Sequence, residues 1–456
     1  MPRNDREPET RQEAQVRLIR EAYGDQIEPG PEDWHETGIQ FFVRKEFVMV
    51  ADEVATRAVE ILRRSDRLPP EDDDRPSEPR MAPLTRDRTR DETDEPMDGD
   101  VWDGMRWIRL REGVSVLETV RLLRPALGDE NVAPELLLHV SPSTGGCCPA
   151  DEPTPVTSGS PVDPPICPDR GAGAGIRVVV LDTGFDHRAA GLSWLTGVTG
   201  DPDLGIKNGK LDPYAGHGTF IAGLIRAMAP AAEVIVRRAF RPLGVVFERD
   251  LVRELREALR DDQPDVISLS AGTTADTANG PRLLNRFHDR TLRRNKGVVI
   301  VAAAGNDSRR KQFWPAASPW AVGVGALAPG GRVRAEFSNF GGWVDVFAPG
   351  QHLVNAFPAG TFVYQEPPRK GSSATFHSLA SWSGTSFATP VVAGLIAARM
   401  SRTGENGRRA ADALLAHARR AAIPGVGAVL QPGDCAAAAC CCRPGERDAG
   451  HRPGCC

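Results

Sequence analysis

The chain has 456 residues, of which 40% are hydrophobic and 26% are charged, so it is long enough for one large domain and a smaller one. Its net charge of −5 and pI near 6.1 argue against nucleic acid as the main partner. A membrane span would need about 18 consecutive apolar residues, and none occur; the charged N-terminus also lacks a signal-peptide core. We therefore expect a soluble, cytoplasmic protein, with secretion by another route left open.

The first 140 residues predict a charged segment followed by a small α+β domain. Residues 1–40 predict a frayed helix and a loop. Residues 41–50 predict a strand, and 52–65 predict a helix with Val54, Ala58, Ile61 and Leu62 on one face. Residues 66–100 are rich in Pro, Arg and acidic residues, which is typical of a disordered insertion. Strand, helix and strand then follow at 105–110, 114–127 and 132–140. Residues 41–140 thus predict an open sheet with helices on one face.

The nine cysteines lie outside the predicted cores. Three belong to residues 141–170, a linker rich in Pro, Ser, Thr and Gly that a protease could cut, and six belong to a tail at residues 433–456. Adjacent pairs do not match zinc-binding spacing, so no metal is expected. An unstructured thiol-rich tail, disulfides, thiol modification and soft-metal binding remain alternatives. The cysteines are Cys147, Cys148, Cys167, Cys435, Cys440, Cys441, Cys442, Cys455 and Cys456.

Residues 171–432 predict a doubly wound, mostly parallel α/β sheet. Apolar runs without two-residue alternation are typical of parallel strands buried on both faces, and helical segments separate them. A Gly-rich stretch at 171–175 precedes its strand, whereas a dinucleotide-binding loop follows one, so we reject that function. The predicted strands are 177–181, 234–237, 266–269, 298–303 and 321–327, and the helices are 220–228, 248–260 and 281–294.

The stretch SWSGTSFATPVVAG at residues 381–394 predicts a turn that leads into a helix, with Ser386 at the helix start. Pro390 fits the first turn, where its missing N–H has no intrahelical partner. Unpaired N–H groups and the helix dipole there suit a nucleophile that forms an oxyanion. Taken alone, the stretch also fits an ordinary Ser/Thr helix cap.

Further polar residues lie where strands end or helices begin. Asp182 ends VVVLD, Asn306 ends VVIVAAAGN, and His217 opens a helix; Ser270, Ala271 and Gly272 close VISLS. In open parallel sheets the functional crevice forms at the carboxyl ends of the strands. Each residue has an ordinary structural explanation by itself. Together they supply an acid, a base, a nucleophile and an amide donor.

These motifs resemble the four signature blocks of the subtilisin-like serine proteases: DTG at Asp182, HGT at His217, AAGN at Asn306 and SGTSFATP at residues 383–390. The resemblance covers about residues 171–439 and keeps the family order. It implies an endopeptidase that cuts proteins or peptides through an acyl-enzyme, with Ser386 as nucleophile, His217 as base and Asp182 as orienting acid. Asn306 and the Ser386 N–H would bind the oxyanion, and Ser270, Ala271 and Gly272 would pair with the substrate.

Two departures from the family stand out. Phe220 replaces a usual second histidine, which removes a competing base without affecting catalysis. The loop after Asn306, DSRRKQFW, is bulky and basic, so we expect a restricted or acid-tolerant specificity. No Asp-rich calcium loop is visible, so no cofactor is expected, and calcium would rest on the family alone.

Alternatives remain for the N-terminal domain and for the whole chain. The small domain resembles, in layout only, the family's propeptide that assists folding and inhibits the site; a regulatory or targeting domain is the alternative. The whole chain could instead be a maturation enzyme that cuts or cyclises a dedicated precursor. An inactive binding module is a further alternative, against which the intact set of four residues argues.

Overall fold

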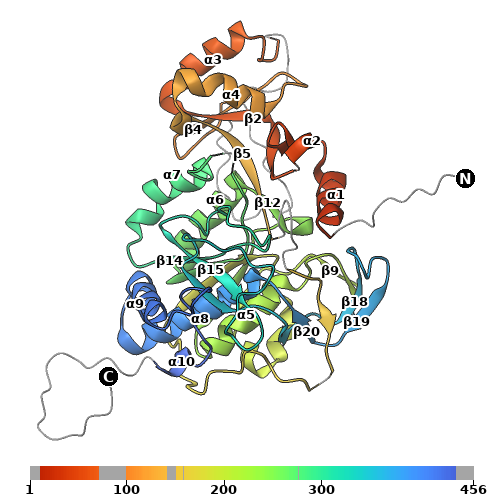
Figure 1. The fold of residues 1–456 in the computed structure, drawn as a ribbon, viewed down its shortest axis with the longest axis vertical. Helices are drawn as coiled ribbons and strands as arrows, with labels where there is room; N and C mark the ends of the chain where they lie inside the picture. Colours follow the sequence, from red (N-terminus) through yellow and green to blue (C-terminus); the bar gives the residue numbers. More distant parts are fainter. Residues whose placement is uncertain are drawn as a thin grey trace, which may run out of the picture.

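The computed structural model describes residues 11–37, 39–70, 99–140, 150–157, 159–275 and 277–437. Most of the predicted insertion and most of the cysteine tail lie outside these ranges. The described residues form an N-terminal unit and a larger C-terminal unit, which lie at the top and bottom of Figure 1.

The larger unit is built on seven parallel strands in the order β16-β15-β14-β13-β7-β11-β8, which confirms the predicted sheet. The side chains of β7, an inner strand, alternate between two cores: Val178 and Val180 face one hydrophobic cluster, and Val179 and Leu181 face the other. Burial on both faces explains the unbroken apolar runs. The strands are β7 (Arg177–Asp182), β8 (Thr199–Gly200), β11 (Glu233–Arg238), β13 (Val266–Leu269), β14 (Val299–Ala303), β15 (Ala321–Leu327) and β16 (Val346–Pro349).

Helices cover both faces of this sheet. On one face lie α5 (His217–Met228), α8 (Thr385–Thr403) and α9 (Gly407–Arg420). On the other lie α6 (Glu248–Glu257) and α7 (Arg282–Arg290), between the sheet and the N-terminal unit (Figure 1). The predicted helices are therefore present, each within a few residues of its expected bounds.

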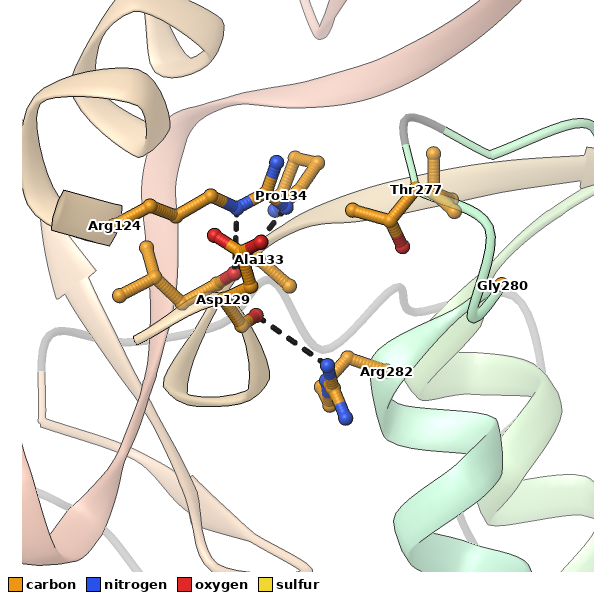
Figure 2. A pocket seen from close by; sticks show the side chains of 9 residues that line it. Arg124, Asp129, Ala133, Pro134, Thr277, Gly280 and Arg282 are labelled. Atoms are coloured by element: carbon orange, nitrogen blue, oxygen red, sulfur yellow. Dashed lines mark hydrogen bonds between the residues drawn. The ribbon is translucent and has the colours of Figure 1, made fainter. Parts of the chain in front are cut away.

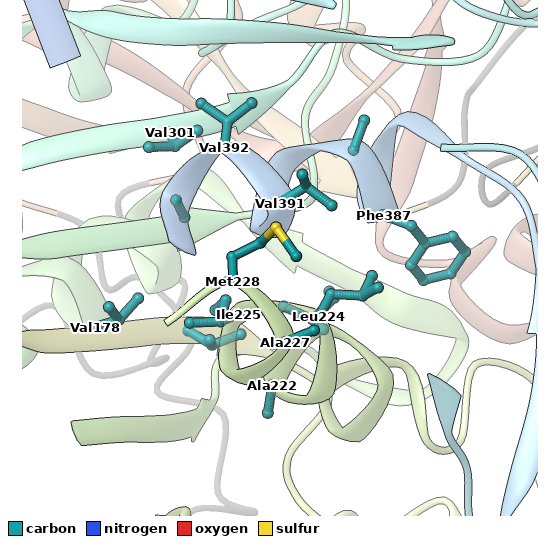
Figure 3. Close-up of a cluster of buried hydrophobic side chains, with 14 of the residues drawn as sticks. Val178, Ala222, Leu224, Ile225, Ala227, Met228, Val301, Phe387, Val391 and Val392 are labelled. Atoms are coloured by element: carbon teal, nitrogen blue, oxygen red, sulfur yellow. The ribbon is translucent and has the colours of Figure 1, made fainter. Parts of the chain in front are cut away.

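Helices α5 and α8 pack closely, and Figure 3 shows Leu224, Met228 and Val391 between them. A Cβ on Gly394 would lie 2.6 Å from the Met228 Cβ and 2.9 Å from the Ile225 carbonyl oxygen, so only glycine allows this approach. Since one helix begins at His217 and the other just before Ser386, their packing fixes the two residues relative to each other.

The N-terminal unit contains the predicted sheet, with α3 (Ala55–Arg64) and α4 (Val116–Leu127) on one face. It also contains part of the segment expected to be frayed. Helix α1 (Arg11–Tyr23) packs Ile19 against Phe42, and β1 pairs with β2. IEPG has one large apolar residue, so its strand has no visible alternation. The remaining elements are β1 (Ile27–Gly30), α2 (Trp34–Thr37), β2 (Phe41–Ala51), β3 (Val101–Trp102), β4 (Met105–Arg109) and β5 (Val132–His139).

The predicted linker is partly built into the larger unit. Strand β6 (Thr154–Pro155) pairs antiparallel with β20 (Leu379–Trp382). A disulfide joins buried Cys167 to buried Cys435, just inside the short helix α10 (Asp434–Ala437). Smaller strands complete the unit: β9 (Ile206–Lys207), β10 (Lys210–Leu211), β17 (Leu353–Ala356), β18 (Gly360–Val363) and β19 (Ser373–Phe376).

The two units share a sheet. Strand β12 (Val245–Phe247) of the larger unit pairs antiparallel with β5, Phe247 opposite Leu137. A second contact lies beside the pocket in Figure 2, where the Arg282 side chain donates to the Asp129 carbonyl oxygen at 3.3 Å. In the ranges given above, no helix has the length and apolarity that a bilayer crossing requires.

Candidate active site

Asp182 and His217 form a buried pair. Asp182 ends β7, and its Oδ1 accepts from the Thr183 N–H at 2.8 Å and from His217 Nδ1 at 2.7 Å. His217 follows Gly216, whose φ of +82° suits glycine and where a Cβ would overlap Pro358. The side chains of Asp182 and His217 are both fully buried. A carboxylate that holds Nδ1–H leaves Nε2 as the proton acceptor of the imidazole.

Asp203 holds the loops that carry this pair. Its Oδ2 accepts from the Gly216 N–H at 2.7 Å and from the Thr183 hydroxyl at 3.1 Å. Burial raises the pKa of Asp203 to about 6. Sequence reasoning missed this residue, because its partners lie in two other segments and no motif marks it.

Ser386 is the second residue of α8 and is 1% exposed. Its hydroxyl donates to the Ser270 carbonyl oxygen at 3.5 Å. His217 Nε2 is buried and has no hydrogen-bond partner among the residues that the structure describes. The imidazole lies beside the start of α8, with its ring centroid 5.3 Å from that of Phe387. The structure thus places the imidazole against the helix start that carries Ser386, and no hydrogen bond joins His217 to Ser386 among the described residues.

Asn306 is fixed against the start of the same helix. Its Oδ1 accepts from the Thr385 N–H at 2.8 Å, and the Gly305 N–H donates to the Thr385 hydroxyl at 3.1 Å. The amide oxygen therefore faces Thr385, which turns the NH2 group to the other side. The Ser386 N–H lies in the first turn of α8, where backbone donors have no intrahelical acceptor.

The segment 270–272, predicted to pair with substrate, borders Ser386 and pairs with the chain's own His139. The Ser270 hydroxyl donates to the Ser386 carbonyl oxygen at 2.8 Å. Gly272 exchanges two backbone hydrogen bonds with His139, at 3.0 and 3.1 Å. Ala271, between Ser270 and Gly272, is buried. The strand that occupies this edge is the end of β5, from the chain's own N-terminal unit.

Two aromatic rings, those of Trp382 and Phe387, contact the His217 imidazole. Trp382 lies edge-on with its ring centroid 5.5 Å from that of the imidazole, and the Phe220 ring packs against Phe387 with 4.6 Å between ring centroids. Phe220 therefore fills apolar space where the family usually has a second histidine. Trp382 was not singled out from the sequence, although it lies four residues before Ser386.

Phe313 fills the space between segments 270–272 and 305–306. A Cβ on Gly272 would overlap its ring, and a Cβ on Gly305 would lie 3.1 Å from it. Phe313 is 2% exposed, whereas Arg309, Arg310 and Lys311 of the same loop are exposed. The bulk predicted for this loop thus lies beside Gly272 and Gly305 as an aromatic ring, and the basic side chains are exposed to solvent.

Residues 173–430, more than half of the chain, match the subtilase family of peptidases, Peptidase S8. The chain belongs to this family. It is 31% identical to a thermophilic serine proteinase of Bacillus sp. (strain AK1) over 253 residues, covering 51% of this chain and 54% of the relative. It is 30% identical to subtilisin BL of Lederbergia lenta over 259 residues, covering 52% and 81%. The chain thus spans about half the length of the first relative.

Solved structures give similar matches. One is a cold-adapted subtilisin-like serine proteinase, with 21% identity, a TM-score of 0.44, and coverage of 62% of this chain and 95% of that one. Another is the prenylagaramide maturation protease PagA, with 26% identity, a TM-score of 0.41, and coverage of 55% and 85%. In the described part of this chain, no three His, Cys, Asp or Glu side chains gather as metal ligands would.

Proposed function

We propose that the chain is a serine endopeptidase in which Ser386 attacks a peptide carbonyl carbon. His217 Nε2 takes the hydroxyl proton and later gives it to the leaving amine, and Asp182 holds the imidazole tautomer and stabilises its protonated form. The acyl-enzyme is then hydrolysed by water with the same groups. The observation that carries this proposal is the buried 2.7 Å contact between Asp182 and His217, beside the helix start that bears Ser386.

Two donors would bind the oxyanion in the proposed mechanism. One is the Ser386 N–H in the first turn of α8, and the other is the Asn306 NH2, turned away from Thr385 because the amide oxygen is held there at 2.8 Å. Donors fixed before the reaction stabilise developing charge without reorganisation.

One side-chain rotation separates this state from a reactive one. The Ser386 hydroxyl points to the Ser270 carbonyl oxygen at 3.5 Å, a weak contact, while His217 Nε2 lacks a partner among the described residues. In the proposed mechanism, a turn about the Ser386 χ1 angle takes the hydroxyl from that oxygen toward the imidazole. The energy barrier to such a rotation is small compared with the barrier of the chemical step.

We further propose that the N-terminal unit inhibits the site until the chain is cut after it. Its strand β5 lies in the cleft like a substrate: His139 pairs with Gly272, and the Val140 N–H donates to the Gly244 carbonyl oxygen at 2.8 Å. Buried Glu135 accepts from Arg44 at 2.8 Å, and also from the Arg249 N–H at the start of α6 at 3.2 Å. Such contacts support an inhibitor more directly than a targeting domain.

The specificity should favour small residues before the scissile bond. Phe313 occupies the space between Gly272 and Gly305, where a substrate side chain would otherwise enter beside the oxyanion donors. A filled pocket rejects large side chains by overlap, and the rim leaves room for a small one.

Labelling with a serine-directed fluorophosphonate tests the proposal. The full chain should be labelled at Ser386, and His217→Ala should slow labelling by about 10³-fold or more. Ser386→Ala should abolish the labelled peptide, while Ser372→Ala, at an exposed serine, should leave it unchanged. Equal labelling of the parent chain and Ser386→Ala would reject the assignment.

A further inference from the structure

Two segments of the chain contact residues that lie around Ser386. The end of β5 arrives along Gly272, the edge next to Ser270. The second segment, residues 150–155, lies along Trp382 and Ser383, directly before the helix that carries Ser386.

The second segment is bound through one dipeptide. The Ala150 N–H donates to the Ser383 carbonyl oxygen at 2.7 Å. In return the Ser383 N–H and hydroxyl donate to the two carboxylate oxygens of Asp151, at 2.9 and 2.7 Å. The Trp382 indole N–H donates to the Asp151 carbonyl oxygen at 2.7 Å.

This strip lies on the leaving-group side of the site. The leaving amine takes its proton from the imidazole, so the peptide that departs must lie beside His217. Trp382 contacts that imidazole at 5.5 Å between ring centroids. The acyl-side edge, Gly272, is already occupied by the end of β5.

We propose that Ser383 and Trp382 form a leaving-group subsite that selects an aspartate, and that Asp151 is its resident occupant. The proposal rests on the peptidase function proposed above. A carboxylate accepts from two donors at once, and both bonds are charge-assisted, whereas an amide offers one oxygen only. Ser383 is 2% exposed, and apart from Asp151 its hydroxyl has only the His352 Nδ1 atom, at 3.5 Å, as an acceptor. A partner that cannot accept from both Ser383 donors would therefore leave one of them buried with this long contact or with none.

The occupant stays with the larger unit after the linker is cut before it. Glu152 accepts from the Gln365 N–H at 2.8 Å, and the Tyr364 hydroxyl donates to the Pro153 carbonyl oxygen at 3.2 Å. Removal of the N-terminal unit therefore opens the acyl half only. A substrate with several residues after the scissile bond must displace Asp151 before it binds. A substrate with no residue after the scissile bond, such as an anilide, need not.

The test uses the self-cut protein and peptides that share one acyl half. One peptide ends in an anilide, and the others continue for about four residues with a single Asp or Asn at each position in turn. Asp151→Ala should raise kcat/KM about 10-fold or more for the extended peptides, through KM, and leave the anilide unchanged. One Asp position should exceed its Asn counterpart by about 10-fold.

Controls separate the outcomes. Ser383→Ala should remove the preference for Asp, and Asp169→Ala, at another aspartate of the predicted linker, should behave like the parent. If Asp151→Ala unfolds at a lower temperature than the parent, Asp151→Asn takes its place in the same peptide assay. Equal rates for Asp and Asn at every position, or an anilide that gains as much as the extended peptides, would overturn the proposal. If no variant cuts any substrate, the peptidase function itself fails.

Discussion

The two segments near Ser386 both use backbone pairing, but only one adds a charged side chain. The end of β5 is held by backbone pairing on both sides, to Gly244 and Gly272, with a neutral buried histidine between them. The segment at residues 150–155 pairs through Ala150 and β6, and its Asp151 carboxylate also accepts from the Ser383 N–H and hydroxyl. Backbone pairing accepts many sequences, whereas two donors aimed at one side chain accept few. The acyl half of the cleft should therefore respond to shape and burial, and the leaving half to charge.

The largest effect should come from Asn306→Ala. This substitution removes a group that acts in the chemical step, and it changes neither of the two segments. Loss of one oxyanion donor should lower kcat by about 10²- to 10³-fold, the size known for subtilisins, with KM nearly unchanged. Steady-state kinetics on a short anilide measures both constants. Asn285→Ala on α7 is the matched control, and a change in KM alone would contradict the role given to Asn306.

Acid should loosen the β5 segment through His139. This side chain is fully buried, and burial lowers its pKa from 6.5 to about 3. The docked state holds it neutral, so docking is unaffected above pH 6.5 and weakens as pH falls from 6.5 to about 3. At pH 5 the loss should be roughly 30-fold, since each pKa unit is worth about 1.4 kcal/mol.

Amide hydrogen exchange at Gly272 measures this docking directly, in an uncut Ser386→Ala chain. As the pH is lowered, the protection of the Gly272 amide, corrected for intrinsic rates, should decrease in the chain with His139 relative to His139→Leu. Burial also raises the pKa of Glu248 to about 8, which weakens the same interface as pH rises from 4.5 to 8. Both chains share that opposite trend, so their difference isolates His139; identical pH profiles would contradict the account.

A smaller effect should follow Phe313→Ala. This substitution tests whether the acyl half of the cleft selects substrates by shape. Opening the pocket should shift the preferred residue before the scissile bond from small to large apolar, by about 10-fold or more in kcat/KM. A peptide library compared across the two chains measures this. A parent enzyme that already prefers large apolar residues would refute the pocket assignment.

The sequence predicts best what depends on local pattern. Strand β7 reads as an unbroken apolar run because both its faces are buried, and Asp182, His217, Asn306 and Ser386 each lie in a short motif. The sheet, its main helices and the family follow from these features.

Features made by distant partners were not predictable. Asp151 is one acid in a polar linker, and its role depends on Ser383, 232 residues further on. Phe313 was part of a bulky loop with no sign of which side chain faces the site. The disulfide between Cys167 and Cys435 closes a separation of 268 residues, and as disulfides persist in oxidising compartments it fits poorly with the cytoplasmic location that we predicted.

Mass spectrometry of the purified full chain beside its Ser386→Ala variant tests the central claim most directly. If Ser386 is the nucleophile of a peptidase that its own N-terminal unit holds in check, the parent chain should be cut between residues 140 and 171 and the variant should keep its full mass of 49.2 kDa. The same cut in both chains, or none in either under conditions that label Ser386, would contradict it.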